Sequence, residues 1–164
     1  MRVLSALLVL LAASSALADE PRGCDKFAWN IADAQRLLAT PRPPSAGPND
    51  RNASIAISLS LAPLADARLK LPPERTSSNA SSLAGSVEFA GAAHAATYAI
   101  TLSAAAWIDL IQDGKYLKPV AFTGAVECPR VRKSVKFAIG PDPFTLQLSG
   151  ATSDTISLVV TPAD

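Results

Sequence analysis

The sequence contains a single histidine, His94, among 164 residues. Catalytic zinc sites commonly use two or three histidines, and a facial-triad iron site needs two plus a carboxylate, so this chain alone supplies neither. The eight glycines are scattered, and the phosphate-binding patterns GxGxxG and GxxxxGK do not occur. A GxSxG turn for a serine nucleophile is also absent. We therefore expect a non-catalytic protein with no metal and no cofactor.

The chain also lacks an excess of charge of either sign. It has 15 Lys and Arg residues against 14 Asp and Glu residues, and removing Arg2 with an N-terminal leader would leave 14 against 14. A neutral surface argues against nucleic acid as a partner and against electrostatic adsorption to a membrane. Beyond the leader, no run approaches the roughly 20 apolar residues of a membrane helix, so we expect no integral membrane segment.

The first residues predict export. Arg2 supplies one positive charge, residues 3–13 form an apolar run, and Ala16-Leu17-Ala18 is a small-x-small cleavage site. The apolar run is too short to span a bilayer. We expect a signal peptide over residues 1–18, cleavage near Ala18, and a periplasmic or secreted mature protein.

Cysteine is scarce as well, and both copies, Cys24 and Cys128, would remain after cleavage. An even number of cysteines in an oxidising compartment favours a disulfide. The two do not form a CxxC pair, which favours a structural bridge over a redox or metal role.

Apolar residues alternate with polar ones along most of the mature chain, as in strands with one buried face. We expect a single domain over residues 19–164, with loops at 41–52 and 74–82. About eight strands at short spacings predict an antiparallel β-sandwich or jelly roll. The apolar runs cover residues 55–61, 69–71, 83–89, 98–102, 106–111, 115–118, 134–139, 144–148 and 156–160.

One segment reads as a helix. Within residues 25–44, apolar residues from Ile31 to Leu38 recur at helical spacing, and prolines follow. Asn30, with Asp33 three residues later, resembles a capping box. We expect one short N-terminal helix that packs on the sheet.

The stretch from Tyr98 to Pro119 carries the strongest strand pattern. We interpret it as a central meander in which residues 98–102 and 106–111 are partner strands, followed by an Asp-Gly turn. Trp107 and Asp109 then project from the face opposite Ile108 and Leu110. An exposed indole beside a carboxylate can hold a sugar ring or a cationic group. The alternative is that the N-terminal helix covers this face, with Asp109 paired to a basic side chain.

Four basic side chains within residues 130–136 could pair with Asp109 or with an acidic ligand. A strand face exposed to solvent would also explain this cluster of charges. Our candidate ligand-binding residues are Trp107, Asp109 and Arg132. The basic residues concerned are Arg130, Arg132, Lys133 and Lys136.

Three segments carry a resemblance: CDKFAW at residues 24–29, the strand pair at 98–109, and CPRVRKSVKF at 128–137. Together they resemble a family of small exported bacterial proteins to which no activity is assigned. The resemblance supports the Cys24–Cys128 bridge. Some members carry the label homogentisate 1,2-dioxygenase, but this chain is far too short for that enzyme, has an export signal and lacks the histidine ligands for iron.

The sequence thus favours an exported β-sandwich that binds an unidentified ligand or protein partner. A structural or envelope-assembly protein without a ligand site is the first alternative. A hydrolase that uses two carboxylates is the second, although nothing in the sequence brings two carboxylates to the separations of about 5–9.5 Å seen in glycosidases.

Overall fold

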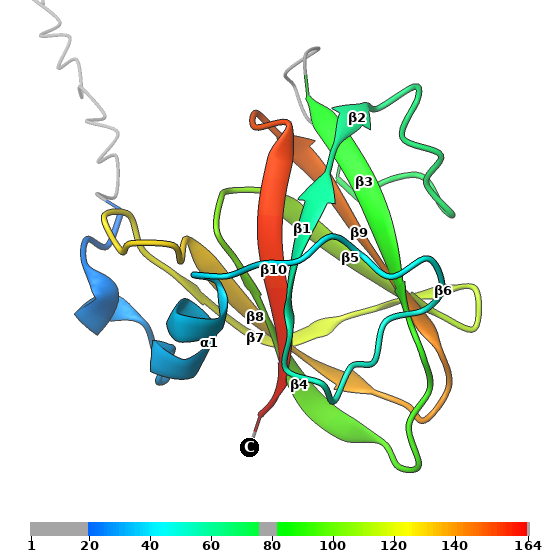
Figure 1. The fold of residues 1–164 in the computed structure, drawn as a ribbon, viewed down its shortest axis with the longest axis horizontal. Helices are drawn as coiled ribbons and strands as arrows, with labels where there is room; N and C mark the ends of the chain where they lie inside the picture. The colour runs from blue at the N-terminus through cyan, green and yellow to red at the C-terminus, as the bar shows by residue number, and fades with distance from the viewer. Residues whose placement is uncertain (1–19, 76–81, 164) are drawn as a thin grey trace, which may run out of the picture.

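The fold consists of two antiparallel sheets of five strands each (Figure 1), in a computed structural model that describes residues 20–75 and 82–163. The predicted signal peptide lies outside the described residues. One sheet has the strand order β1-β10-β4-β8-β7, and the other has the order β2-β3-β9-β5-β6. The strands are β1 (Ala56–Ser60), β2 (Ala62–Pro63), β3 (Leu83–Phe89), β4 (Ala96–Leu102), β5 (Trp107–Gln112), β6 (Lys115–Leu117), β7 (Pro119–Gly124), β8 (Lys133–Ile139), β9 (Phe144–Ala151) and β10 (Thr155–Pro162).

Two strand pairs are continuous passages from one sheet to the other. Only Leu61 separates β1 from β2, and only Lys118 separates β6 from β7. Counting each passage as one strand gives eight strands, paired around the fold in the jelly-roll order. The predicted antiparallel β-sandwich or jelly roll is confirmed. The strands that switch sheets thus occupy both edges of the sandwich.

The main core lies between the two sheets and is formed by the alternating apolar residues of both. Ile100 and Leu102 of β4, Ile108 and Leu110 of β5, and Leu146 of β9 are all buried in it. Fully burying one such side chain contributes about 1.5–3 kcal/mol relative to leaving it exposed. The period-two pattern therefore identified the inward faces of these strands correctly.

The pattern did not identify the strand partners. The prediction that residues 98–102 pair with 106–111 is wrong: β4 pairs with β10 and β8, whereas β5 pairs with β9 and β6 in the other sheet. Residues 103–106 cross between the sheets. The alternation of apolar residues identifies which face of a strand is buried. Two strands that face each other across the core have the same alternation as two strands that are hydrogen-bonded side by side, so the pattern cannot distinguish these arrangements.

Two further details differ from expectation. The strand β7 is absent from the predicted apolar runs, because its Val120 and Phe122 are exposed and therefore give no buried apolar stripe. Conversely, residues 69–71 are not a strand. They lie along the second sheet through side-chain contacts.

The N-terminal segment covers the outer face of the first sheet (Figure 1). It contains a 3-10 turn, η1 (Cys24–Lys26), and the predicted helix, which is only six residues long, α1 (Ala32–Leu37). Asn30 Oδ1 accepts a hydrogen bond from Ala32 N at 2.8 Å, but Asp33 pairs with Arg36 instead of completing the capping box. A small second core, which includes Ile31, joins this segment to β1 and β10.

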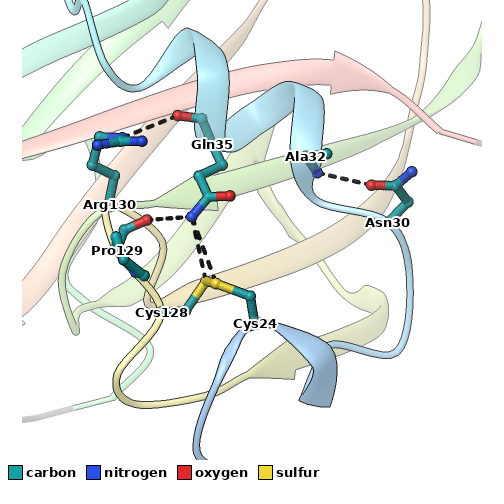
Figure 2. Close-up of a disulfide and its surroundings, with 7 residues drawn as sticks. All are labelled: Cys24, Asn30, Ala32, Gln35, Cys128, Pro129 and Arg130. Carbon is teal, nitrogen blue, oxygen red and sulfur yellow. Dashed lines mark hydrogen bonds between the residues drawn. A yellow bond between two sulfur atoms is a disulfide. The ribbon is translucent and has the colours of Figure 1, made fainter.

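The predicted disulfide is present and fastens this segment (Figure 2). Cys24 and Cys128 are bonded, with their Cα atoms 4.8 Å apart. Gln35 of α1 lies over the bridge, and its amide Nε2 donates to the carbonyl oxygen of Pro129 at 2.8 Å. The helix, the bridge and the loop before β8 are thereby held together.

Candidate functional site

The outer face of the second sheet carries buried polar residues because a loop covers it. Asp109, Gln147 and Ser149 point away from the core, yet each is at most 3% exposed. The cover is the segment 69–75. The alternative that the N-terminal helix covers Trp107 and Asp109 is therefore wrong, since that helix packs on the other sheet.

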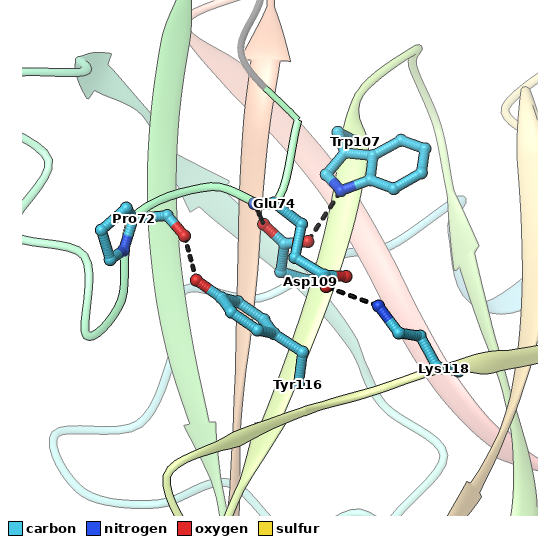
Figure 3. A network of polar contacts seen from close by, with 6 residues as sticks. All are labelled: Pro72, Glu74, Trp107, Asp109, Tyr116 and Lys118. Atoms are coloured by element: carbon cyan, nitrogen blue, oxygen red, sulfur yellow. Dashed lines mark hydrogen bonds and ion pairs between the residues drawn. The ribbon is translucent and has the colours of Figure 1, made fainter.

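Side chains of the second sheet hold this covering segment in place (Figure 3). Gln147 Oε1 accepts hydrogen bonds from Lys70 N at 2.6 Å and Leu71 N at 3.1 Å, while its Nε2 donates to Leu71 O at 2.9 Å. The Tyr116 hydroxyl donates to the carbonyl oxygen of Pro72. A polar strand face thus fixes a loop that has no sheet pairing of its own.

Asp109 fixes the orientation of Trp107. Its carboxylate accepts a hydrogen bond from the indole Nε1 at 2.7 Å and a second from Glu74 N at 3.2 Å (Figure 3). Among the described residues no cation forms an ion pair with Asp109. Burial raises the pKa of this carboxyl, opposed by the hydrogen bond from Trp107. Asp109 is therefore a positioning residue that holds the indole from behind.

The raised pKa of Asp109 gives a pH-dependent prediction. A carboxyl with a raised folded pKa binds its proton more readily in the folded state, so its contribution to stability is complete below the unfolded pKa of about 3.9 and is lost as pH rises through the folded pKa. Asp109→Asn has no such titration. We expect the stability of Asp109→Asn relative to the wild type to improve as pH rises from about 4 towards neutrality, measured by urea unfolding at several pH values. A constant difference across this range would contradict the prediction.

A cavity of about 670 Å³ lies beside Trp107. It forms because β6 pairs with β5 only as far as Leu117, after which the chain crosses to the first sheet and β7 pairs with β8. The strands β5 and β7 diverge there and open a gap into the core. The apolar residues that line it are Ala105, Ala106, Ile108, Leu117, Phe122, Val135 and Phe137.

Two cations lie against the indole of Trp107 at this cavity. The Arg75 guanidinium carbon is 4.6 Å from the ring centroid, and Lys133 Nζ is 5.4 Å from it. Lys133 Nζ also donates to the carbonyl oxygen of Ala106 at 3.1 Å. Burial lowers the pKa of Lys133, and the nearby charges of Arg132 and Arg75 lower it further. Cation–π contacts of this kind contribute about 0.5–2 kcal/mol each.

Two ion pairs complete the cavity mouth. Arg132 Nη2 contacts both carboxylate oxygens of Glu20, at 2.8 and 2.9 Å. Lys118 Nζ contacts Glu74 Oε1 at 2.6 Å. Within residues 20–75 and 82–163, neither Arg75 nor Lys133 forms an ion pair.

The three predicted ligand-binding residues thus lie near one another but differ in their position relative to the cavity. Trp107 and Arg132 line the cavity, whereas Asp109 lies behind the indole and does not line it. The basic cluster divides: Lys133 joins Arg132 at the cavity, but Arg130 contacts Gln35 O beside the disulfide, and Lys136 lies over Trp29 on the first sheet.

Arg75, Glu20 and Phe122 were not singled out from the sequence. Arg75 and Glu20 stand far from Trp107 in the chain and reach the cavity through the covering loop and the N-terminal segment, respectively. Phe122 carried no usable sequence signal, because its 78% exposure on β7 is a property of the fold.

Within the described residues, no helix is long and apolar enough to cross a membrane, and no group of three or more His, Cys, Asp or Glu side chains is arranged to hold a metal ion. Comparison of the chain with protein-family models, with curated proteins and with solved structures finds no match.

Proposed function

We propose that the protein is an exported, non-catalytic β-sandwich that binds a small ligand in the Trp107 cavity. The observation that carries this proposal is the half-buried indole, held by Asp109 at the mouth of a cavity of about 670 Å³. Small-molecule sites have volumes of about 300–1,000 Å³, with mostly apolar walls and a few polar groups that fix orientation. The cavity has this composition.

Export and the family resemblance stay part of the proposal. The signal peptide over residues 1–18 and cleavage near Ala18 are predictions from sequence, and the disulfide supports an oxidising compartment such as the periplasm or the exterior. The burial of Asp109 behind an indole counts against the carboxylate-dependent hydrolase. The exposed Val120 and Phe122 of β7 favour a second candidate, an envelope-assembly protein that contacts a partner through this strand.

An uncharged fluorescent probe tests ligand binding. We expect N-phenyl-1-naphthylamine to bind the wild type with enhanced fluorescence, and to bind Trp107→Ala about tenfold more weakly because an aromatic wall of the cavity is lost. Ala105→Trp fills the cavity from an exposed position and should weaken binding similarly.

Trp29→Ala is the matched control, because it removes the chain's other indole from the opposite sheet. It should leave probe binding unchanged, with thermal unfolding measured for all variants. Absence of probe binding to the wild type, or wild-type affinity for the probe in both Trp107→Ala and Ala105→Trp, would favour the envelope-assembly alternative.

A further inference from the structure

The cavity mouth combines an apolar wall with more cations than carboxylates. Four basic residues line it, and the two acidic residues among the described lining, Glu20 and Glu74, are each engaged with one of them. The remaining two, Arg75 and Lys133, converge on the same indole. Two like charges gathered on one ring repel each other, and an anion between them would relieve that repulsion. The basic lining residues are Arg75, Lys118, Arg132 and Lys133.

The chain's own carboxylate already occupies part of this mouth. Glu20 places both carboxylate oxygens within 2.9 Å of Arg132 Nη2. The Glu20 side chain is 61% exposed, so a competing anion can reach its position from solvent. Pro21 anchors the segment next to it, because its carbonyl oxygen accepts a hydrogen bond from Val126 N at 2.8 Å. Glu20 therefore shows that this mouth accepts a carboxylate.

Behind the charged mouth the cavity is apolar. Ile108, Val135 and Phe137 belong to the main core, and the cavity reaches them from outside. A small inorganic anion would leave this surface in contact with water, whereas an apolar chain or ring would cover it. Phe122, 78% exposed on the lip, extends the apolar surface outward.

From these contacts we infer that the ligand is an amphipathic carboxylate. Its acid group lies between Arg75 and Lys133 and competes with Glu20 for the cationic mouth, and its apolar body lies on Trp107 and on the core residues behind it. This inference rests on the proposed function, since it names the ligand class of the same cavity.

Decanoate and 1-decanol form a test pair that differs only in the acid group. Binding is measured below the micelle concentration through Trp107 fluorescence in a Trp29→Phe background, which leaves one tryptophan. We expect decanoate to bind at least about tenfold more tightly than decanol, with a preference that shrinks as salt is added. Arg75→Gln and Lys133→Gln should each reduce this preference about threefold to tenfold and leave decanol binding within about twofold.

Glu20→Gln moves the preference in the opposite direction. Removing the competing carboxylate should tighten decanoate binding about threefold or more without changing decanol binding. Lys115→Gln is the matched control, since Lys115 is an exposed lysine of β6 outside the cavity lining, and it should change neither affinity.

The outcomes separate this inference from the proposed function. Equal binding of decanoate and decanol, or an unchanged preference in Arg75→Gln and Lys133→Gln, overturns the carboxylate inference while ligand binding stands. Failure of decanoate, decanol and the naphthylamine probe alike overturns both.

Discussion

Replacing Cys24 and Cys128 together with serine is expected to lower the free energy of unfolding by about 2–5 kcal/mol. The bridge spans a sequence separation of 104 residues. In the chain-entropy account a closed loop of that length contributes up to about 4.7 kcal/mol by restricting the unfolded chain. Since domains of this size are stable by only about 5–15 kcal/mol, the double variant loses a large share of its stability.

The double variant should also lose cooperativity, because the disulfide holds a segment with few other contacts. The small second core lies on the outer face of the first sheet, and α1 has only six residues, too few to form a stable helix alone. The two tryptophans report the two regions: Trp29 packs against the second core, and Trp107 lies on the main sandwich. In urea titrations of single-tryptophan variants, the signals should coincide with the bridge present, and the Trp29 transition should come first without it.

Gln35→Ala is a control that keeps the bridge. It removes the amide that lies over the sulfur atoms and donates to Pro129 O, and it should cost about 1 kcal/mol with coincident transitions. A loss below about 1 kcal/mol in the double cysteine variant, with both tryptophans still reporting one transition, would show that packing alone holds the segment.

The disulfide and the inward faces of the strands could be predicted because each depends on a local or unique feature. Two cysteines allow one pairing, and alternation along β4 and β5 is visible within a few residues. The partners of β4 and β5 could not be predicted in the same way. They depend on where the chain crosses between sheets, and residues 103–106 carry no signal that separates a crossing from a hairpin.

The candidate site likewise has features that the local sequence pattern predicts and features that depend on the tertiary fold. The projection of Trp107 and Asp109 from one face of β5 followed from period two, and so did their separation from Ile108 and Leu110. What covers that face did not follow. The cover is a segment without regular structure, held by Gln147 and Tyr116, whose roles depend on strand order. The cavity itself arises where β5 and β7 diverge, a tertiary feature that residue pattern does not encode.

The burial of Arg51 could not be predicted from the sequence, because this charged residue lies in the predicted loop at 41–52. In the structure it is 0% exposed. Its guanidinium donates to three carbonyl oxygens: Gly140 O at 2.9 Å, Pro141 O at 2.7 Å and Asp142 O at 3.2 Å. We expect Arg51→Ala to lower the free energy of unfolding by about 3–5 kcal/mol, since it leaves a cavity and removes the donors from these carbonyls. Chemical denaturation monitored by circular dichroism measures this loss.

Arg51→Met separates packing from hydrogen bonding. The guanidinium carbon lies 5.5 Å from the ring centroids of both Tyr98 and Phe144. Methionine keeps apolar volume beside these rings but donates no hydrogen bond, and the exposed positions of Pro141 and Asp142 allow water to replace some of the lost donors. It also removes the cost of burying a charge that has no carboxylate partner among the described residues. The loss should therefore be smaller, about 1–3 kcal/mol.

Hydrogen exchange locates the effect. Ala92 N donates to Pro141 O at 2.7 Å, so release of the 140–142 turn should speed exchange of the Ala92 amide in both variants. Asn52→Ala is the neighbouring control: it loses only the hydrogen bond from the Tyr98 hydroxyl and should cost about 1 kcal/mol or less. A free energy of unfolding for Arg51→Ala within about 1 kcal/mol of the wild-type value, together with unchanged exchange of the Ala92 amide, would contradict a structural role for Arg51. Arg51 and the Trp107 cavity lie at opposite ends of β5. Arg51 lies beside Phe144, which pairs with Gln112 at one end, whereas Trp107 pairs with Ser149 at the other. Folded Arg51 variants should therefore still bind the naphthylamine probe like the wild type.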